Sequence, residues 1–355
     1  MALLLSKDSY INEILLNLQS DSVSDVHIKS DAEIRYRFNG DIVTLENSKI
    51  LSVKEIINDL STILNERIKT EFNINKQVDF SFAISNKTRY RANMYKTTSG
   101  ISLALRKINN TIKTLEELMA PEIIKKIAHL QKGLVIISGP TGSGKSTTLN
   151  SIINYINNNF NKHIITIEDP IEFLHTSRKC LINQREVGND TNNFSLAIKS
   201  ALREDPDIIL IGEIRDAESI KQCLHAAETG HLVFTTMHTQ TAAKSIDRII
   251  DSCEVGEKEL IRSMLSTSLQ AVILQKLIKT IDNKSRVAAY EVLLGINSVR
   301  NLIRENKINA IDSMIQINSR YGMIDMKTSI EKLYSDGLIS KEEMNNNLIN
   351  LNDEK

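Results

Sequence analysis

Alternating polar and apolar residues dominate the first third of the chain. Polar residues separate Ile34, Tyr36 and Phe38, for example, which is the two-residue period of a strand with one buried face. Apolar residues at helical spacing precede and follow this segment. We therefore expect an antiparallel sheet with helices, a small α+β domain, over residues 1–110. Its expected strands are 34–38, 78–84, 89–95 and 101–105, and its expected helices are 11–18 and 53–72.

The pattern changes in the rest of the chain, where strands become short, continuous apolar runs between helical segments. Such runs, alternating with helices, indicate a parallel sheet that is covered on both faces. We expect a linker at 109–111, a second domain over 111–355, and a mostly helical chain after Leu269. The expected strands of the second domain are 134–138, 164–167, 208–211 and 232–236.

The composition narrows the class of protein. Lysine plus arginine and aspartate plus glutamate each number 44 in 355 residues, so the net charge is zero. A dedicated nucleic-acid binder usually carries a basic excess, and we expect no direct nucleic-acid binding. Cys180, Cys223 and Cys253 form no C-x-x-C pair, which predicts free thiols and no zinc site. No segment approaches the ~18 apolar residues of a membrane span, and the first ten residues lack a basic signal-peptide region, so we expect a soluble, cytoplasmic protein.

The sequence GPTGSGKST, from Gly139 to Thr147, completes the pattern G-x-x-x-x-G-K-[ST] between an expected strand and an expected helix. Its glycines allow backbone N–H groups to turn toward phosphate oxygens, and the helix directs its positive end at the same anion. Lys145 is expected to reach the β- and γ-phosphates of ATP, and Ser146 to hold Mg²⁺. The residues expected to hold the nucleotide are Gly139, Pro140, Thr141, Gly142, Ser143, Gly144, Lys145, Ser146 and Thr147.

Carboxylates follow two further expected strands, and the carboxyl ends of parallel strands meet at one edge of the sheet. Glu168 and Asp169 follow one strand, and Glu213 follows another. Glu213 is the expected catalytic residue, because a carboxylate there can orient the water that attacks the γ-phosphate. Gly212 stands where P-loop ATPases usually have an aspartate for Mg²⁺. We therefore expect Glu168 and Asp169 to supply the anions for the metal, partly through water.

Two histidines lie on or beside the expected strand 232–236. His238 follows the strand and is expected to hydrogen-bond the γ-phosphate, which would distinguish ATP from ADP. His231 lies seven residues earlier, roughly 23 Å away along an extended strand. The two side chains therefore cannot contact one phosphate, and we assign His231 to a contact between subunits.

Arginines in the first domain are candidates for an arginine finger, which stabilises charge on the transferred phosphoryl group. Arg89 and Arg91 lie two residues apart, so both project from one face of their strand, and Arg106 ends the next strand. Arg35 and Arg37 have the same spacing on an earlier strand. Spacing alone does not rank these pairs.

The motifs together resemble those of the PilT-type retraction ATPases of type IV pili, within the larger family of secretion ATPases. The phosphate loop is followed by ITIEDPIEF at 165–173, REDPDIILIGEIRD at 203–216 and TGHLVFTTMHT at 229–239. The resemblance covers nearly the whole chain and implies an α/β protein. A PAS-like α+β domain would precede a RecA-like P-loop ATPase domain with a mostly parallel sheet and a helical C-terminus. It also implies catalytic roles for Arg89, Arg91 and Arg106.

A further motif lies near the C-terminus. SVRNLIREN at 298–306 resembles the AIRNLIRE motif of the retraction members, with conservative departures at Ser298 and Val299. Extension and export members usually carry a longer N-terminal region and a tetracysteine zinc insertion, neither of which this sequence shows. The resemblance implies that the motif serves retraction rather than hydrolysis, although an ordinary amphipathic helix end would show the same pattern. The motif residues are Arg300, Asn301, Leu302, Ile303, Arg304 and Glu305.

The resemblance also implies an assembly and a location. The family forms homohexameric rings, as a head-to-tail interface that closes allows, and acts on an inner-membrane platform protein at the pilus base. We expect this chain to associate with the cytoplasmic face of the inner membrane. Alternatives are an accessory retraction paralogue, an extension or type II secretion ATPase, and a scaffold that binds ATP without turnover. A DNA translocase is a weaker alternative, given the zero net charge.

Overall fold

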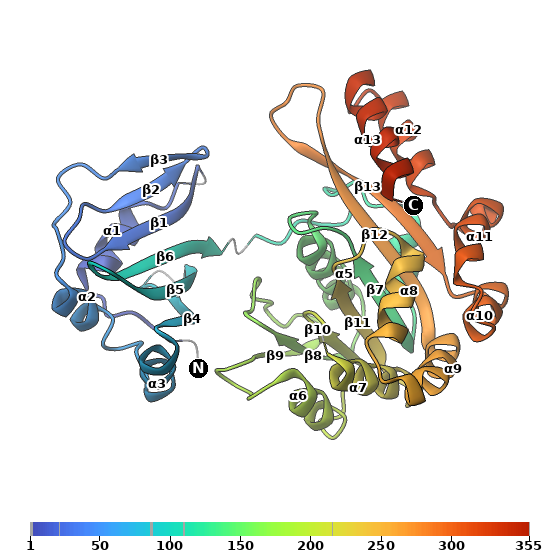
Figure 1. Ribbon diagram of the computed structural model, residues 1–355, viewed down its shortest axis with the longest axis horizontal. Helices are drawn as coiled ribbons and strands as arrows, with labels where there is room; N and C mark the ends of the chain where they lie inside the picture. The colour runs from blue at the N-terminus through green and yellow to red at the C-terminus, as the bar shows by residue number, and fades with distance from the viewer. Residues whose placement is uncertain (1–2, 21, 86–87, 109–110, 215, 355) are drawn as a thin grey trace. The chain divides into compact units, whose positions relative to one another are not determined.

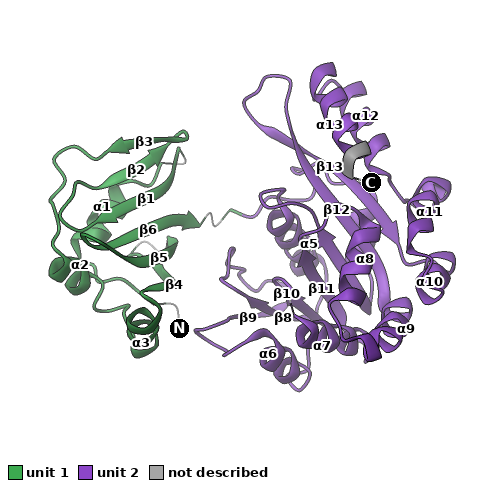
Figure 2. Cartoon of the chain, viewed as in Figure 1, with its two compact units in different colours: residues 1–111 green, residues 112–355 purple. Residues whose placement is uncertain are grey.

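The computed structural model describes residues 3–354 apart from 21, 86–87, 109–110 and 215. The chain divides into two compact units, Met1–Thr111 and Ile112–Lys355 (Figure 2). Most of the expected linker, Asn109 and Asn110, lies outside the described residues. None of the helices in the described part of the chain combines the length and the apolar composition that a membrane span requires.

The first unit is a six-stranded antiparallel sheet with helices against one face (Figure 1). Its strand order is β3-β2-β1-β6-β5-β4, and the apolar residues of alternate positions form a single core with the helices. The expected helix 53–72 is two helices instead, because Asn65 caps a new helix with its side chain. The elements are α1 (Tyr10–Asn17), β1 (Val23–Lys29), β2 (Arg35–Phe38), β3 (Asp41–Thr44), α2 (Val53–Asp59), α3 (Glu66–Asn75), β4 (Gln77–Ala83), β5 (Arg89–Thr97) and β6 (Gly100–Ile108).

The second unit is a seven-stranded sheet in the order β13-β12-β7-β11-β10-β8-β9. Every neighbouring pair is parallel except the β12–β13 hairpin. Apolar residues of α6 to α9 pack against one face of the sheet, and those of α4 and α5 against the other. The strands are β7 (Gly133–Ser138), β8 (His163–Glu168), β9 (Leu181–Glu186), β10 (Ile208–Ile211), β11 (Leu232–Met237), β12 (Leu269–Lys279) and β13 (Arg286–Leu294).

The expectation of a mostly helical chain after Leu269 is wrong as far as Leu294, because residues 269–294 form the long hairpin β12–β13. Leu269 and residues 271–275 are buried in the sheet, so the apolar run lacks the period of a one-sided strand and cannot be told from a helix by periodicity. Helices do follow the hairpin. The helices of the unit are α4 (Glu122–Ala128), α5 (Lys145–Asn159), α6 (Phe194–Ala201), α7 (Ala217–Glu228), α8 (Ala242–Asp251), α9 (Lys258–Ser268), α10 (Asn297–Arg304), α11 (Ile311–Ile317), α12 (Met326–Ser335) and α13 (Lys341–Glu354), with 3₁₀ turns at Val255–Glu257, Ile308–Ala310 and Ser319–Tyr321.

Candidate active site

The phosphate loop joins the buried strand β7 to helix α5 and has the backbone that its glycines permit. Gly139, Gly142 and Gly144 have φ values of +144°, +77° and +85°, which L side chains rarely adopt. A Cβ on Gly139 would lie 2.3 Å from the carbonyl oxygen of Gln275, on the neighbouring strand β12. Glycine is therefore required at position 139 both for the turn and for the close approach of β12.

Lys145 begins helix α5 and is buried at the centre of the loop. Its Nζ donates to the carbonyl oxygens of Gly139, at 2.8 Å, and Pro140, at 2.9 Å. Burial lowers the pKa of Lys145, and the negative charges of Glu213 and Glu172 oppose that shift. The cation thus lies where the phosphate loop and the acidic strand ends meet.

The carboxyl ends of β7, β8, β10 and β11 open on one cleft with a volume of about 670 Å³, within the usual range of ligand pockets. Its lining includes most of the residues that we singled out for phosphate, metal and catalysis. The loop residues Gly139, Pro140 and Ser143 are not among the lining residues, and the side chain of Ser143 is buried. The predicted residues that line the cleft are Thr141, Gly142, Gly144, Lys145, Ser146, Thr147, Glu168, Asp169, Glu213 and His238.

Glu213, His238 and Lys145 form a cluster at one end of this cleft. The Nε2 of His238 lies 3.4 Å from the Oε1 of Glu213, and its Nδ1 lies 3.4 Å from the Nζ of Lys145. The backbone beside the ring is also held, because Arg248 of α8 donates to the carbonyl oxygen of His238 at 3.1 Å. A base, an imidazole and an ammonium thus converge beside the phosphate loop.

Glu168 lies deeper than the other carboxylates and is only 5% exposed. Burial raises its pKa to about 7, although the hydroxyl of Thr166, at 2.7 Å, and the amide of Gln184, at 3.2 Å, donate to its Oε1. Gly212 explains how Glu168 reaches this position. A Cβ at position 212 would lie 3.3 Å from the Cα of Glu168, so the residue that replaces the usual aspartate allows the two strand ends to pack closely.

His231 lies at the opposite end of β11 from His238. It precedes the strand, and its carbonyl oxygen accepts from the backbone N–H of Gly133 at 2.9 Å, where β7 begins. Its Nδ1 lies 3.0 Å from the carbonyl oxygen of Ala226. His231 therefore takes no part in the cleft, and its role between subunits stays a prediction.

The arginines of the first unit share the polar face of its sheet. Arg91 pairs with Arg106, and Arg106 pairs with Asp25, so these side chains project from one face. The Nε of the exposed Arg106 donates to Asp25 at 2.8 Å, and Arg37 pairs with Asp25 from β2. Arg89 is buried at one end of this face and donates to the hydroxyl of Ser81 at 2.7 Å. The sheet therefore presents both arginine pairs on the same side.

The C-terminal motif covers helix α10 and divides into a packed and an exposed part. Ile303 is buried against the core. Arg300 donates to the carbonyl oxygens of Gly295 at 2.6 Å, Thr267 at 3.1 Å and Leu269 at 3.3 Å. Leu302 is half-buried. The exposed residues of the motif are Asn301, Arg304 and Glu305.

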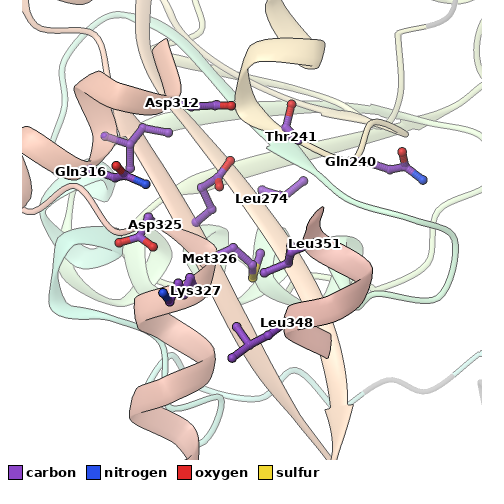
Figure 3. A pocket seen from close by; sticks show the side chains of 12 residues that line it. Gln240, Thr241, Leu274, Asp312, Gln316, Asp325, Met326, Lys327, Leu348 and Leu351 are labelled. Atoms are coloured by element: carbon purple, nitrogen blue, oxygen red, sulfur yellow. The ribbon is translucent and has the colours of Figure 1, made fainter. Parts of the chain in front are cut away.

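A second cavity, of about 190 Å³, lies among the C-terminal helices (Figure 3). Leu274, Met326 and Leu351 form part of its apolar wall, and α11, α12 and α13 surround it. Glu291 also lines it, but this carboxylate accepts from the N–H of Ala242 at 3.0 Å and so caps helix α8. None of the residues predicted from the sequence lines this cavity, so the cleft at the phosphate loop is the candidate active site.

Comparisons with known proteins place the chain in a family. The model of the family described as "Type II/IV secretion system protein" matches residues 5–347. The chain belongs to this family. Among its relatives, the "Twitching motility protein" of Neisseria gonorrhoeae is 51% identical over 86% of this chain and 82% of its own length. The "Type IV pilus retractation ATPase PilT" of Pseudomonas aeruginosa is 46% identical over 94% of this chain and 96% of its own.

A solved structure of a pilus retraction motor is similar to this chain in both fold and sequence. The crystal structure of the pilus retraction motor PilT with bound ADP superposes with a TM-score of 0.86 at 40% identity, covering 94% of this chain and 95% of that one. The α/β architecture of this secretion-system family member, with a mostly parallel sheet and helices at the C-terminus, is therefore confirmed.

Several residues around the cleft could not be found from the sequence. Thr166 and Gln184 hold Glu168, and they pair with each other across β8 and β9. Only the position of Thr166, two residues before Glu168 on the same strand, offered a signal. Glu172, Leu277 and Arg286 also line the cleft. The last two come from the hairpin β12–β13, which the apolar pattern did not reveal.

Proposed function

We propose that this chain is an ATP-hydrolysing motor that powers retraction of type IV pili. The observation that carries the proposal is the convergence of Lys145, Glu213 and His238 in the cleft at the phosphate loop. A phosphate cradle beside a carboxylate and an imidazole suits phosphoryl transfer to water. Two close relatives bear the names of a twitching motility protein and a pilus retraction ATPase, which supports pilus retraction as the work performed.

The cleft residues divide the chemistry among them. The loop N–H groups and Lys145 bind the β- and γ-phosphates, and the positive end of α5 faces the same anion. Glu213 orients the attacking water and accepts its proton. His238 hydrogen-bonds the γ-phosphate, and its contact with Glu213 at 3.4 Å links this phosphate to the position of the base. Loss of the γ-phosphate would thus remove a contact of His238 and change the surroundings of Glu213.

The same cleft offers oxygen ligands of the kind that Mg²⁺ prefers. The hydroxyl of Ser146 and the carboxylates of Glu168 and Asp169 all line it, so these residues fit the ion that accompanies ATP. When bound there, the ion would supply positive charge that neutralises the phosphates. Thr166 and Gln184 fix the orientation of Glu168 for that contact.

The motor would work as a homohexamer on a pilus platform protein at the cytoplasmic face of the inner membrane. In this arrangement Arg89, Arg91 and Arg106 stabilise charge on the transferred phosphoryl group, and His231 contacts a neighbouring subunit. The exposed residues of the α10 motif serve the transmission of force rather than hydrolysis. The proposal includes neither a zinc site nor direct contact with nucleic acid.

Phosphate release by the purified chain tests the enzymatic part of the proposal. We expect turnover by the wild type and a loss of at least about 100-fold in kcat for Glu213→Gln, with ATP binding retained, because the amide keeps the shape of the side chain but accepts no proton. Gel filtration with and without ATP reports assembly. Equal, very low rates for both proteins would instead indicate a scaffold that binds ATP without turnover.

A further inference from the structure

An open pocket of about 480 Å³ adjoins the nucleotide cleft. Thr141 of the phosphate loop and His238 line both spaces, so these two side chains lie where the cleft and the pocket meet. The Oγ1 of Thr141 lies 3.4 Å from the Nδ1 of His238, which is long for a hydrogen bond. A group that moves from the cleft into the pocket therefore passes two side chains with only a weak contact between them. The other lining residues of the pocket are Pro140, Thr239, Gln240, Lys244 and Arg248.

The two spaces differ in charge. Five carboxyl groups line the nucleotide cleft, together with the cations Lys145 and Arg286. The pocket is lined by the cations Lys244 and Arg248, and the lining residues that the structure describes include no carboxyl group. An anion that is released in the cleft is therefore repelled by the carboxylates around it and attracted toward the pocket. The carboxyl groups of the cleft belong to Glu168, Asp169, Glu172, Glu213 and Asp216.

Helix α8 carries both cations of the pocket. Lys244 and Arg248 are four residues apart, so they project from the same face of the helix, and both are exposed. The start of the helix is fixed, because the side chain of Thr241 accepts from the backbone N–H of Lys244 at 3.0 Å. One N–H of Arg248 donates to the carbonyl oxygen of His238, and a guanidinium has four further N–H donors. The helix thus places two cations beside the residue that we assign to the γ-phosphate.

We propose that this pocket is an exit site for inorganic phosphate, which Lys244 and Arg248 bind after hydrolysis. The attacking water gives its oxygen to the γ-phosphorus and a proton to Glu213, and the bond from that phosphorus to the β–γ bridging oxygen breaks. The products are ADP, which the phosphate loop still holds, and a separate phosphate dianion beside His238. The dianion leaves past His238 and Thr141 into the pocket. The inference rests on the proposed function, since it follows the product of the same cleft.

Transient kinetics of the full chain test the exit site, because they follow cleavage and release separately. Acid quenching of a single turnover measures the cleavage of ATP, and a fluorescent phosphate sensor measures the appearance of free phosphate. We expect Lys244→Glu to cleave ATP within about twofold of the wild-type rate but to release phosphate at least about tenfold more slowly, because a carboxylate repels the dianion. Lys244→Arg, which keeps the charge, should release phosphate as the wild type does. Lys126→Glu is the matched control, because Lys126 is exposed on α4 and lines neither space.

Inhibition by added phosphate measures the affinity of the exit site independently of the release rate. At saturating ATP the γ position is occupied, so inorganic phosphate should inhibit the wild type without competing with ATP. We expect Lys244→Ala to raise the inhibition constant of phosphate about tenfold, because a hydrogen bond from a charged donor is lost. Salt should raise the wild-type constant as well, since the cations are exposed.

The exit site is wrong if phosphate does not inhibit the wild type, or if it inhibits Lys244→Ala equally well. It is also wrong if Lys244→Glu slows cleavage as much as release, which would place Lys244 in hydrolysis itself. A chain that does not hydrolyse ATP at all contradicts the proposed function instead. Calorimetric titration of phosphate into the chain with a bound non-hydrolysable ATP analogue then decides the exit site independently. Binding that weakens in Lys244→Ala supports it, and equal binding or none contradicts it.

Discussion

Arg300 makes the sharpest single prediction for stability, because one guanidinium holds together three segments of the second unit. It donates to carbonyl oxygens at the end of α9, the start of β12 and the end of the hairpin, at 3.1, 3.3 and 2.6 Å. Hydrogen bonds from a charged donor contribute about 1.5–3 kcal/mol each when buried, and Arg300 is half-buried. We take the two shorter bonds at the lower value, so Arg300→Ala should lower the free energy of unfolding by about 3 kcal/mol.

Differential scanning calorimetry measures this loss. For a unit of this size each kcal/mol corresponds to about 2–4 °C, so the transition of the second unit should move down by about 6–12 °C. Arg300→Lys should recover part of the loss, because an ammonium reaches some of the same carbonyl oxygens without the fork of the guanidinium.

Arg304→Ala is the matched control within the same motif. Arg304 is exposed, and its side chain donates to Asn301 in its own helix at 3.3 Å, so its removal should change stability by less than about 0.5 kcal/mol. If Arg300→Ala melts at the same temperature as Arg304→Ala, the hydrogen bonds of Arg300 do not stabilise the unit as we infer. The pair also separates two roles of the motif, since a stable Arg304→Ala variant that fails to retract pili would indicate recognition rather than folding.

Two further predictions concern titration and the arginine finger. Burial lowers the pKa of His175 to about 4, so between pH 6.5 and 4 the unfolded chain binds a proton that the folded chain does not. As the pH decreases from 6.5 to 4, the free energy of unfolding of the wild type should therefore decrease by up to about 3 kcal/mol more than that of His175→Gln. Urea unfolding at several pH values measures this difference, and parallel curves for the two proteins would contradict the prediction. Arg106→Ala removes an exposed ion pair with Asp25 and should leave the melting temperature nearly unchanged, yet lower kcat about a thousandfold, as for an arginine finger. Arg37→Ala, from the same face of the sheet, should retain activity, and equal rates for the two variants would remove the finger role from Arg106.

The strand ends of the second unit were predictable from the sequence. Continuous apolar runs indicate parallel strands, and the carboxyl ends of parallel strands lie at one edge of the sheet. Glu168, Glu213 and His238 accordingly line one cleft with the phosphate loop. The hairpin β12–β13 was not predictable in this way. Its buried half lacks a polar face, and the place of β12 in the sheet depends on its parallel pairing with β7, which is distant in sequence.

Positioning contacts also escaped the sequence. Gln184 donates to Glu168 from β9, a strand that the apolar pattern did not predict. Gly212 allows the close approach of Glu168 because it has no Cβ. The importance of Arg300 rests on carbonyl oxygens, which every residue carries and which the sequence therefore does not mark. Motifs reveal groups that contact phosphate, whereas the packing that aims those groups becomes visible only in three dimensions.

The number of surface pili tests the central claim most directly. Cells that lack this gene would be complemented with the wild-type chain or with Glu213→Gln, and their pili and twitching movement compared with those of the parent. A retraction motor predicts more pili and no movement in the deletion and in the Glu213→Gln strain, with recovery by the wild type. Cells without pili would show that the chain drives extension, and an unchanged count would indicate an accessory paralogue or a different secretion system; either result would contradict the account.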